Sequence, residues 1–155
     1  MNTAQILESW DIHNRINLYL LDSIDAAHLD SISASKGRNV GEQFAHLHNV
    51  RLMWLKVAAP DLMKGLEKIE KEASGNKKMV SNALKKSATA IKELLDRAFQ
   101  SDGKVKNFKP HAAAFFAYLI SHESHHRGQI LLALKQSGHA VDKKIQYGIW
   151  EWGVR

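Results

Sequence analysis

The sequence contains no cysteine and only two prolines, Pro60 and Pro110. The absence of cysteine excludes disulfide bonds, thiolate metal sites and a cysteine nucleophile supplied by the chain. It also agrees with a reducing compartment, so we expect a cytoplasmic protein. Because proline interrupts helices, its scarcity permits long continuous ones.

Targeting and membrane segments are also missing. The N-terminal residues MNTAQILESWDIHNR lack the basic and apolar regions of a signal peptide. No apolar run approaches the roughly 18 residues that a transmembrane helix needs. We therefore expect a soluble protein that does not bind membranes.

Acidic residues are in the minority, with 16 Asp+Glu against 22 Lys+Arg and a formal net charge of +6. Many of the lysines lie in residues 64–97, where glutamates are interleaved with them. This mixture is typical of a solvated helix face, and the stretch has no aromatic residue on which a base could stack. The sequence therefore argues against a nucleic-acid partner.

Helical periodicity dominates the chain, and no stretch shows sustained alternation of the β type. The pattern predicts four long helices: about Thr3 to Ala27, Val40 to Pro60, about Val80 to Phe99, and from just after Pro110 to about Gln136. The tail after residue 139 can form one more short helix. The expected fold is therefore all-α, a four-helix bundle in a single domain over residues 1–155. The long connector between the second and third helices means that a simple up-down-up-down order is not guaranteed.

Three histidines lie within five residues of the fourth predicted helix, in the stretch SHESHHRGQ. His122 and His126 are four residues apart, so both project from one face, as two nitrogen ligands of one metal ion require. His125 is rotated by about 100° from that face. Burying two unpaired imidazoles costs about 1–3 kcal/mol each, which favours a metal. The alternative is that hydrogen bonds satisfy both rings in the core.

A third ligand should come from a facing helix. The second predicted helix offers His46 and His48, and periodicity does not choose between them.

HESHH also fits the pattern H-E-x-x-H, in which the glutamate is the general base of a zinc protease. The longer metzincin form is not met, because Gln129 and Leu132 stand where it needs glycine and histidine. We expect Glu123 instead to pair with Arg127 on another side of the helix.

Two segments resemble the DinB/YfiT-like family of small metal-binding proteins: VGEQFAHLHNVRLMWL at residues 40–55 and HESHHRGQILLALKQSG at residues 122–138. The resemblance implies a bundle in up-down-down-up order whose metal is held by His46, His122 and His126. It assigns no ligand role to His125 and no chemical role to Glu123.

The resemblance also implies a class of activity, because the family contains thiol-dependent S-transferases and metal-dependent hydrolases. A thiol ionises near pH 8.5 and water near 15.7, so a metal needs a far smaller effect to activate a thiol. We expect transfer of a low-molecular-weight thiol to a small electrophile, with no catalytic residue beyond the metal ligands. The alternatives are a hydrolase and a non-catalytic metal-binding or stress-response bundle. Three histidines suit Zn or Ni, with Fe or Cu as alternatives.

The aromatic tail bears on the oligomeric state. Tyr147, Ile149, Trp150 and Trp152 form an apolar set that a small bundle need not bury alone. Together with the family's frequent dimers, this set predicts a homodimer. The alternative is that these residues cap the bundle's own core.

Overall fold

A computed structural model describes residues 2–155, and the regular elements in this range are all helical. The all-α bundle with a short C-terminal helix, predicted from the sequence, is confirmed. Its helices are α1 (Thr3–Asp22), α2 (Val40–Ala58), α3 (Lys77–Gln100), α4 (Ala112–Gln136) and the short α5 (Lys143–Gly148). Short 3₁₀ turns lie at Ala26–His28, Pro60–Met63, Lys71–Ala73 and Trp152–Val154.

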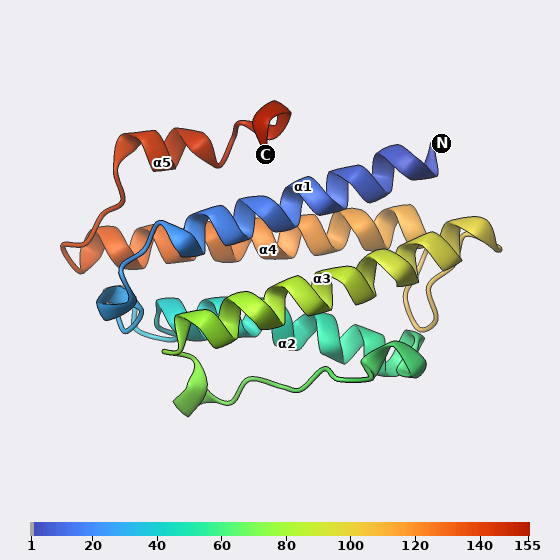
Figure 1. Cartoon of the computed structure of the whole chain (residues 1–155), viewed down its shortest axis with the longest axis horizontal. Coiled ribbons are helices and arrows are strands. Elements are labelled where there is room, and N and C mark those ends of the chain that lie inside the picture. The colour runs from blue at the N-terminus through green and yellow to red at the C-terminus, as the bar shows by residue number, and fades with distance from the viewer. Residues whose placement is uncertain (1) are drawn as a thin grey trace.

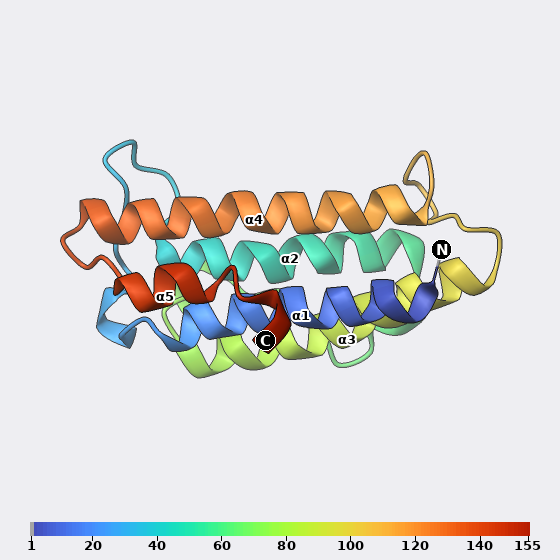
Figure 2. The ribbon, with the colours of Figure 1, turned by 90° about the horizontal axis from the view of Figure 1, so that it is seen from above.

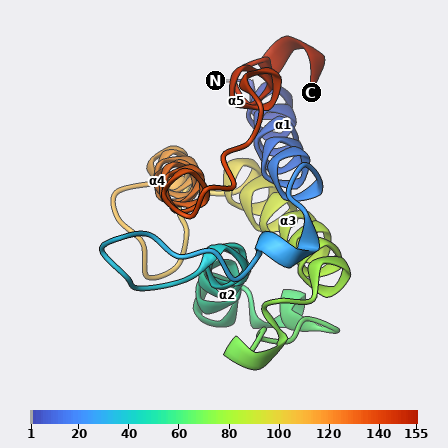
Figure 3. The ribbon, with the colours of Figure 1, turned by 90° about the vertical axis from the view of Figure 1, so that its left-hand side faces the viewer.

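The four long helices run in up-down-down-up order. In Figure 1, α1 and α4 run in one direction along the bundle, and α2 and α3 run in the other. This order arises because the connector between α2 and α3 (residues 59–76) returns along the length of the bundle before α3 begins. The end-on view in Figure 3 places α1 and α2 at opposite corners, so that α2 has α3 and α4 as its neighbours.

Capping side chains account for two differences from the predicted helix limits. The first helix ends at Asp22 instead of about Ala27, because the Asp25 side chain accepts a hydrogen bond from the Ala27 N–H and starts a separate 3₁₀ turn. The third helix begins at Lys77, earlier than predicted, because the Asn76 side chain accepts a hydrogen bond from its first turn.

A buried layer of polar side chains crosses the middle of the bundle between two apolar clusters. One apolar cluster includes Ile16, Phe44 and Ile130, and the other includes Trp10 and Phe115. All four long helices contribute to the polar layer, which consists of His13, Asn14, Asn17, Arg51, Ser87, Glu123 and Arg127.

Glu123 is the centre of this polar layer. Its carboxylate accepts two hydrogen bonds from Arg51, at 2.7 and 2.8 Å, and one from Asn17 at 2.7 Å. It also lies 2.8 Å from Nε2 of His13. The predicted pairing of Glu123 with Arg127 is therefore wrong: Arg127 donates to Asn17, while Arg51 of the facing helix is the ion-pair partner of Glu123. Spacing along one helix could not reveal that a neighbouring helix supplies the closer charge.

The connector between α2 and α3 is fastened to α2 by side chains. Nε2 of His48 lies 2.8 Å from the Glu67 carbonyl oxygen, and the Asn49 side chain makes two hydrogen bonds with the backbone of Ile69. Gly41 has no side chain where the Ser74 carbonyl packs against α2. This packing holds the connector beside His46, the histidine that α2 contributes to the predicted metal site.

The C-terminal tail folds back along α1, as Figure 2 shows. Ile149 is buried against the core and Trp152 is half-buried, whereas Tyr147 and Trp150 are 71% and 76% exposed. Ile149 and Trp152 thus pack against the bundle's own core, whereas Tyr147 and Trp150 remain exposed. Within residues 2–155, no helix has the length and apolar character needed to cross a membrane.

Candidate metal centre

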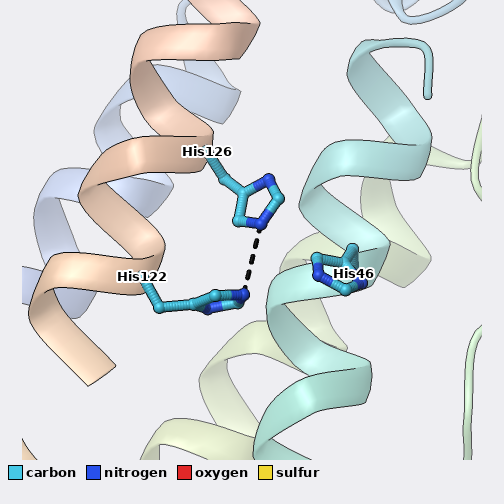
Figure 4. Close-up of side chains that lie close together, drawn as sticks. All are labelled: His46, His122 and His126. Atoms are coloured by element: carbon cyan, nitrogen blue, oxygen red, sulfur yellow. Dashed lines mark hydrogen bonds between the residues drawn. The ribbon is translucent and has the colours of Figure 1, made fainter. Parts of the chain in front are cut away.

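Three histidines from two neighbouring helices come together at the site. His46 extends from α2, and His122 and His126 extend from successive turns of α4, so that the three rings face one another between the helices (Figure 4). Each ring offers a nitrogen, and these nitrogens all lie within 4.8 Å of one another. The i,i+4 pair predicted from the sequence is therefore joined in space by one histidine of the second helix.

The orientation of His126 is set by Gln43. Nδ1 of His126 lies 2.5 Å from Oε1 of Gln43, so the Nδ1–H donates to the amide oxygen and the lone pair is on Nε2. This Nε2 lies 3.2 Å from Nε2 of His122. Two ligands of one tetrahedral ion at 2.0–2.1 Å stand about 3.3 Å apart. His122 and His126 therefore have the spacing of two ligands of one metal ion, and a nitrogen of His46 lies within 4.8 Å of both.

The protonation states of the three rings also suit metal binding. Burial, followed by the charge of Arg38, lowers the pKa of His46 to about 4. Burial and the neighbouring imidazoles lower the pKa of His126 to about 3, and burial also lowers the pKa of His122. Since a metal displaces protons from its ligands, rings that are neutral at pH 7 bind it without that competition.

His48 and His125 lie away from this group. His48 contacts the connector through Nε2, and burial lowers its pKa. His125 is exposed and contacts Gln129. Of the two histidines between which periodicity did not choose, His46 is the one whose ring faces α4, whereas His48 contacts the connector.

Glu123 takes no part in the histidine group, although it follows His122 directly in the sequence. Burial would raise the pKa of its carboxyl, but the charge of Arg51 and the hydrogen bonds from His13 and Arg51 outweigh burial and hold the pKa well below its usual range. A carboxylate so engaged in the core is not placed to accept a proton at the histidine site. The H-E-x-x-H pattern therefore does not describe this site.

Sequence reasoning missed two residues beside the histidines. Gln43 lies three residues before His46, and this helical spacing could have indicated a partner on the same face. Arg38 belongs to the loop before α2, and no periodicity marks it, yet its charge acts on all three histidines.

The fold and the site together define a helical-bundle protein with a three-histidine group suited to one metal ion. The comparison with protein families places it further: the family model described as "DinB family" matches residues 1–148, and the chain belongs to this family. No curated protein and no solved structure matches the chain at a significant level.

Proposed function

We propose that His46, His122 and His126 bind one divalent metal ion per chain, and that the protein transfers a low-molecular-weight thiol to a small electrophile. The observation that supports this proposal is the convergence of three imidazoles whose pKa values are lowered, so that they are neutral at pH 7. Zn and Ni are the first candidates for the ion, and Fe and Cu are the alternatives.

Three protein ligands leave a coordination position for substrate, which is typical of catalytic metal sites. A divalent ion supplies one chemical effect there, since it lowers the pKa of a bound thiol so that the nucleophilic thiolate forms at neutral pH. The remaining contributions come from the chain. Gln43 orients His126, and the surrounding side chains determine which molecules can approach.

An aromatic border lies on one side of the histidines. The Tyr118 ring is stacked at 6.0 Å from that of His122, and its hydroxyl oxygen lies 3.4 Å from the Trp54 indole nitrogen. Met53, on the same turn of α2 as Trp54, is 51% exposed. This border offers an apolar surface to the electrophile.

Hydrolysis is the less favoured alternative. Water must lose a proton that is held far more strongly than that of a thiol, and a hydrolase would be helped by a general base. Glu123, which follows His122 in the sequence, is fully buried and paired with Arg51. Glu42, which lines the cavity beside His46, is paired with Lys71.

The metal content of protein purified without a histidine tag tests the ligand set. We expect about one ion per wild-type chain and a large loss in the triple alanine variant at positions 46, 122 and 126. His48→Ala and His125→Ala are matched controls that should keep the ion, because neither ring faces the site. Undiminished metal in the triple variant, or loss on His48→Ala alone, would contradict the assignment.

A screen of small thiols against the metal-loaded protein tests the activity. We expect sulfur charge-transfer bands with cobalt or nickel and metal-dependent conjugation of a model electrophile. Metal-dependent ester or amide cleavage without any effect of thiols would instead establish the hydrolase. A bound metal without either activity would establish the non-catalytic bundle.

We also propose a homodimer, for which the exposed rings of Tyr147 and Trp150 offer an apolar surface on the tail. Light scattering at high protein concentration tests it. A mass of twice the chain is expected, and a monomer would exclude the dimer.

A further inference from the structure

A cavity of about 670 Å³ borders His46 between the start of α2 and the connector. Its charged lining residues form pairs with one exception. Lys71 lies 3.3 Å from Glu42, and Lys68 lies 2.9 Å from Glu70. Arg38 is the remaining charged residue, and it makes no hydrogen bond or ion pair within residues 2–155. The cavity therefore has one surplus positive charge, and Arg38 provides it.

Arg38 has a defined place in the loop that precedes α2. Lys36 and Gly37 have positive φ angles of 65° and 92°, which turn the chain directly before Arg38, and Asn39 directly after it caps α2. Arg38 also lines a second cavity of about 260 Å³, which includes Gln43, the partner of His126. Arg38, which is exposed, thus lines one cavity beside His46 and a second cavity beside Gln43.

The backbone at the start of α2 does not compete with Arg38 for an anion. The first three N–H groups of the helix are already bonded, to the carbonyl oxygens of Ser31 and Leu29 and to the Asn39 side chain. Since helix N-termini bind anions through free N–H groups, this end of α2 offers none. Recognition of a negative group in the cavity beside His46 therefore depends on the Arg38 side chain.

We infer that the small thiol used at the histidine site bears a carboxylate, and that Arg38 binds this carboxylate while the sulfur lies at the histidines. A single surplus charge matches a singly charged group, and the planar guanidinium can bind both carboxylate oxygens at once. This inference rests on the proposed function for the place of the sulfur. The anion site itself depends only on the cavity and its charges.

Two thiols of similar size, 3-mercaptopropionate and 3-mercapto-1-propanol, test the inference on the cobalt-loaded protein. Dissociation constants are measured from the charge-transfer band. Because hydrogen bonds to a charged group are among the stronger ones, we expect the anionic thiol to bind about tenfold more tightly or better. Arg38→Gln should abolish this preference, and Arg38→Lys should retain part of it.

Arg97→Gln is the matched control. It removes the same charge from an exposed arginine of α3 that pairs with Asp61 and Glu93 and does not line either cavity. The preference for the anionic thiol should survive in this variant. Because each ratio compares the same two thiols, intrinsic differences between them cancel.

A metal-free measurement separates the anion site from the thiol chemistry. Propionate titrated into ¹⁵N-labelled metal-free protein should shift the Arg38 Nε–H resonance in a saturable way. If propionate binds there but no thiol perturbs cobalt, the anion site stands and the thiol function fails. Equal affinity for the two thiols, or a preference unchanged by Arg38→Gln, overturns the inference while leaving the thiol function intact.

Discussion

At the scale of single residues, the histidine site depends on side chains other than the three histidines. Gln43 fixes which nitrogen of His126 holds the proton, and it does so from the same helix that supplies His46. Nδ1 of His122, in contrast, is buried and has no hydrogen-bond partner among residues 2–155. The orientation of the α4 pair is therefore controlled mainly through His126.

Replacing Gln43 should weaken metal binding without removing a ligand. We expect Gln43→Leu to lower the affinity for zinc by about 10–100-fold, because outer partners of metal-bound histidines typically contribute this much. Titration against a competing chelator measures the change. Gln129→Leu is the matched control, since Gln129 contacts the exposed His125 and should leave the affinity unchanged. Equal losses in the two variants would contradict the role of Gln43.

At the scale of elements, the connector between α2 and α3 forms one wall of the cavity beside His46. It packs so closely on α2 that a Cβ atom on Gly41 would overlap the Ser74 carbonyl oxygen. The overlap involves backbone, which cannot rotate away as a side chain could. The close contact therefore requires glycine at this position of the helix.

Gly41→Ala should destabilise the protein despite the higher helix propensity of alanine. We expect a loss of about 1–3 kcal/mol in the free energy of unfolding, the usual cost of overpacking, measured by urea denaturation. Gly75→Ala is the control, because a Cβ there meets nothing within 4 Å and its φ is not positive. An unchanged stability in Gly41→Ala would show that the connector moves aside at little cost.

At the scale of the whole molecule, the polar layer joins all four long helices at one level of the bundle. The guanidinium of Arg51 is fully buried, bonded to Glu123 and placed over the Trp10 ring at 4.9 Å. Arg127 is also buried, and burial lowers its pKa to about 10. Each charge in this layer depends on partners from other helices.

Breaking the central ion pair should therefore be costly. We expect Glu123→Gln to lower the free energy of unfolding by about 3–5 kcal/mol at pH 7, because Arg51 would remain buried without a counter-charge. Glu93→Gln, which removes an exposed partner of Arg97, should cost less than about 1 kcal/mol. Metal stoichiometry in folded Glu123→Gln should stay at one, since Glu123 is not a ligand. A small effect on stability would contradict the importance of the layer.

The metal-free protein should lose stability as the pH falls below about 6.5. Burial lowers the pKa of His13 from 6.5, and the pKa values of His46 and His126 fall to about 4 and about 3. Between these values and 6.5 the unfolded chain binds more protons than the folded one, so protonation favours unfolding. Unfolding free energies measured from pH 8 to pH 5 check the sign. A stability that rises as the pH falls would contradict the lowered pKa values.

The sequence by itself determined the helices and two of the three histidines of the site. Periodicity located the four long helices, and the i,i+4 spacing of His122 and His126 placed two rings on one face of α4. Both properties are local, because a helix fixes the relative directions of side chains only within its own few turns. The resemblance to a family added His46, which local periodicity could not separate from His48.

Only the tertiary structure decided which surfaces meet. His46 faces α4 while His48 faces the connector, and this outcome depends on how α2 is rotated against its neighbours. The burial of Glu123 likewise depends on Arg51 arriving from a facing helix, and the place of Arg38 depends on the path of a loop. Contacts between distant segments depend on packing and charge across space, which the spacing of residues along one helix does not record.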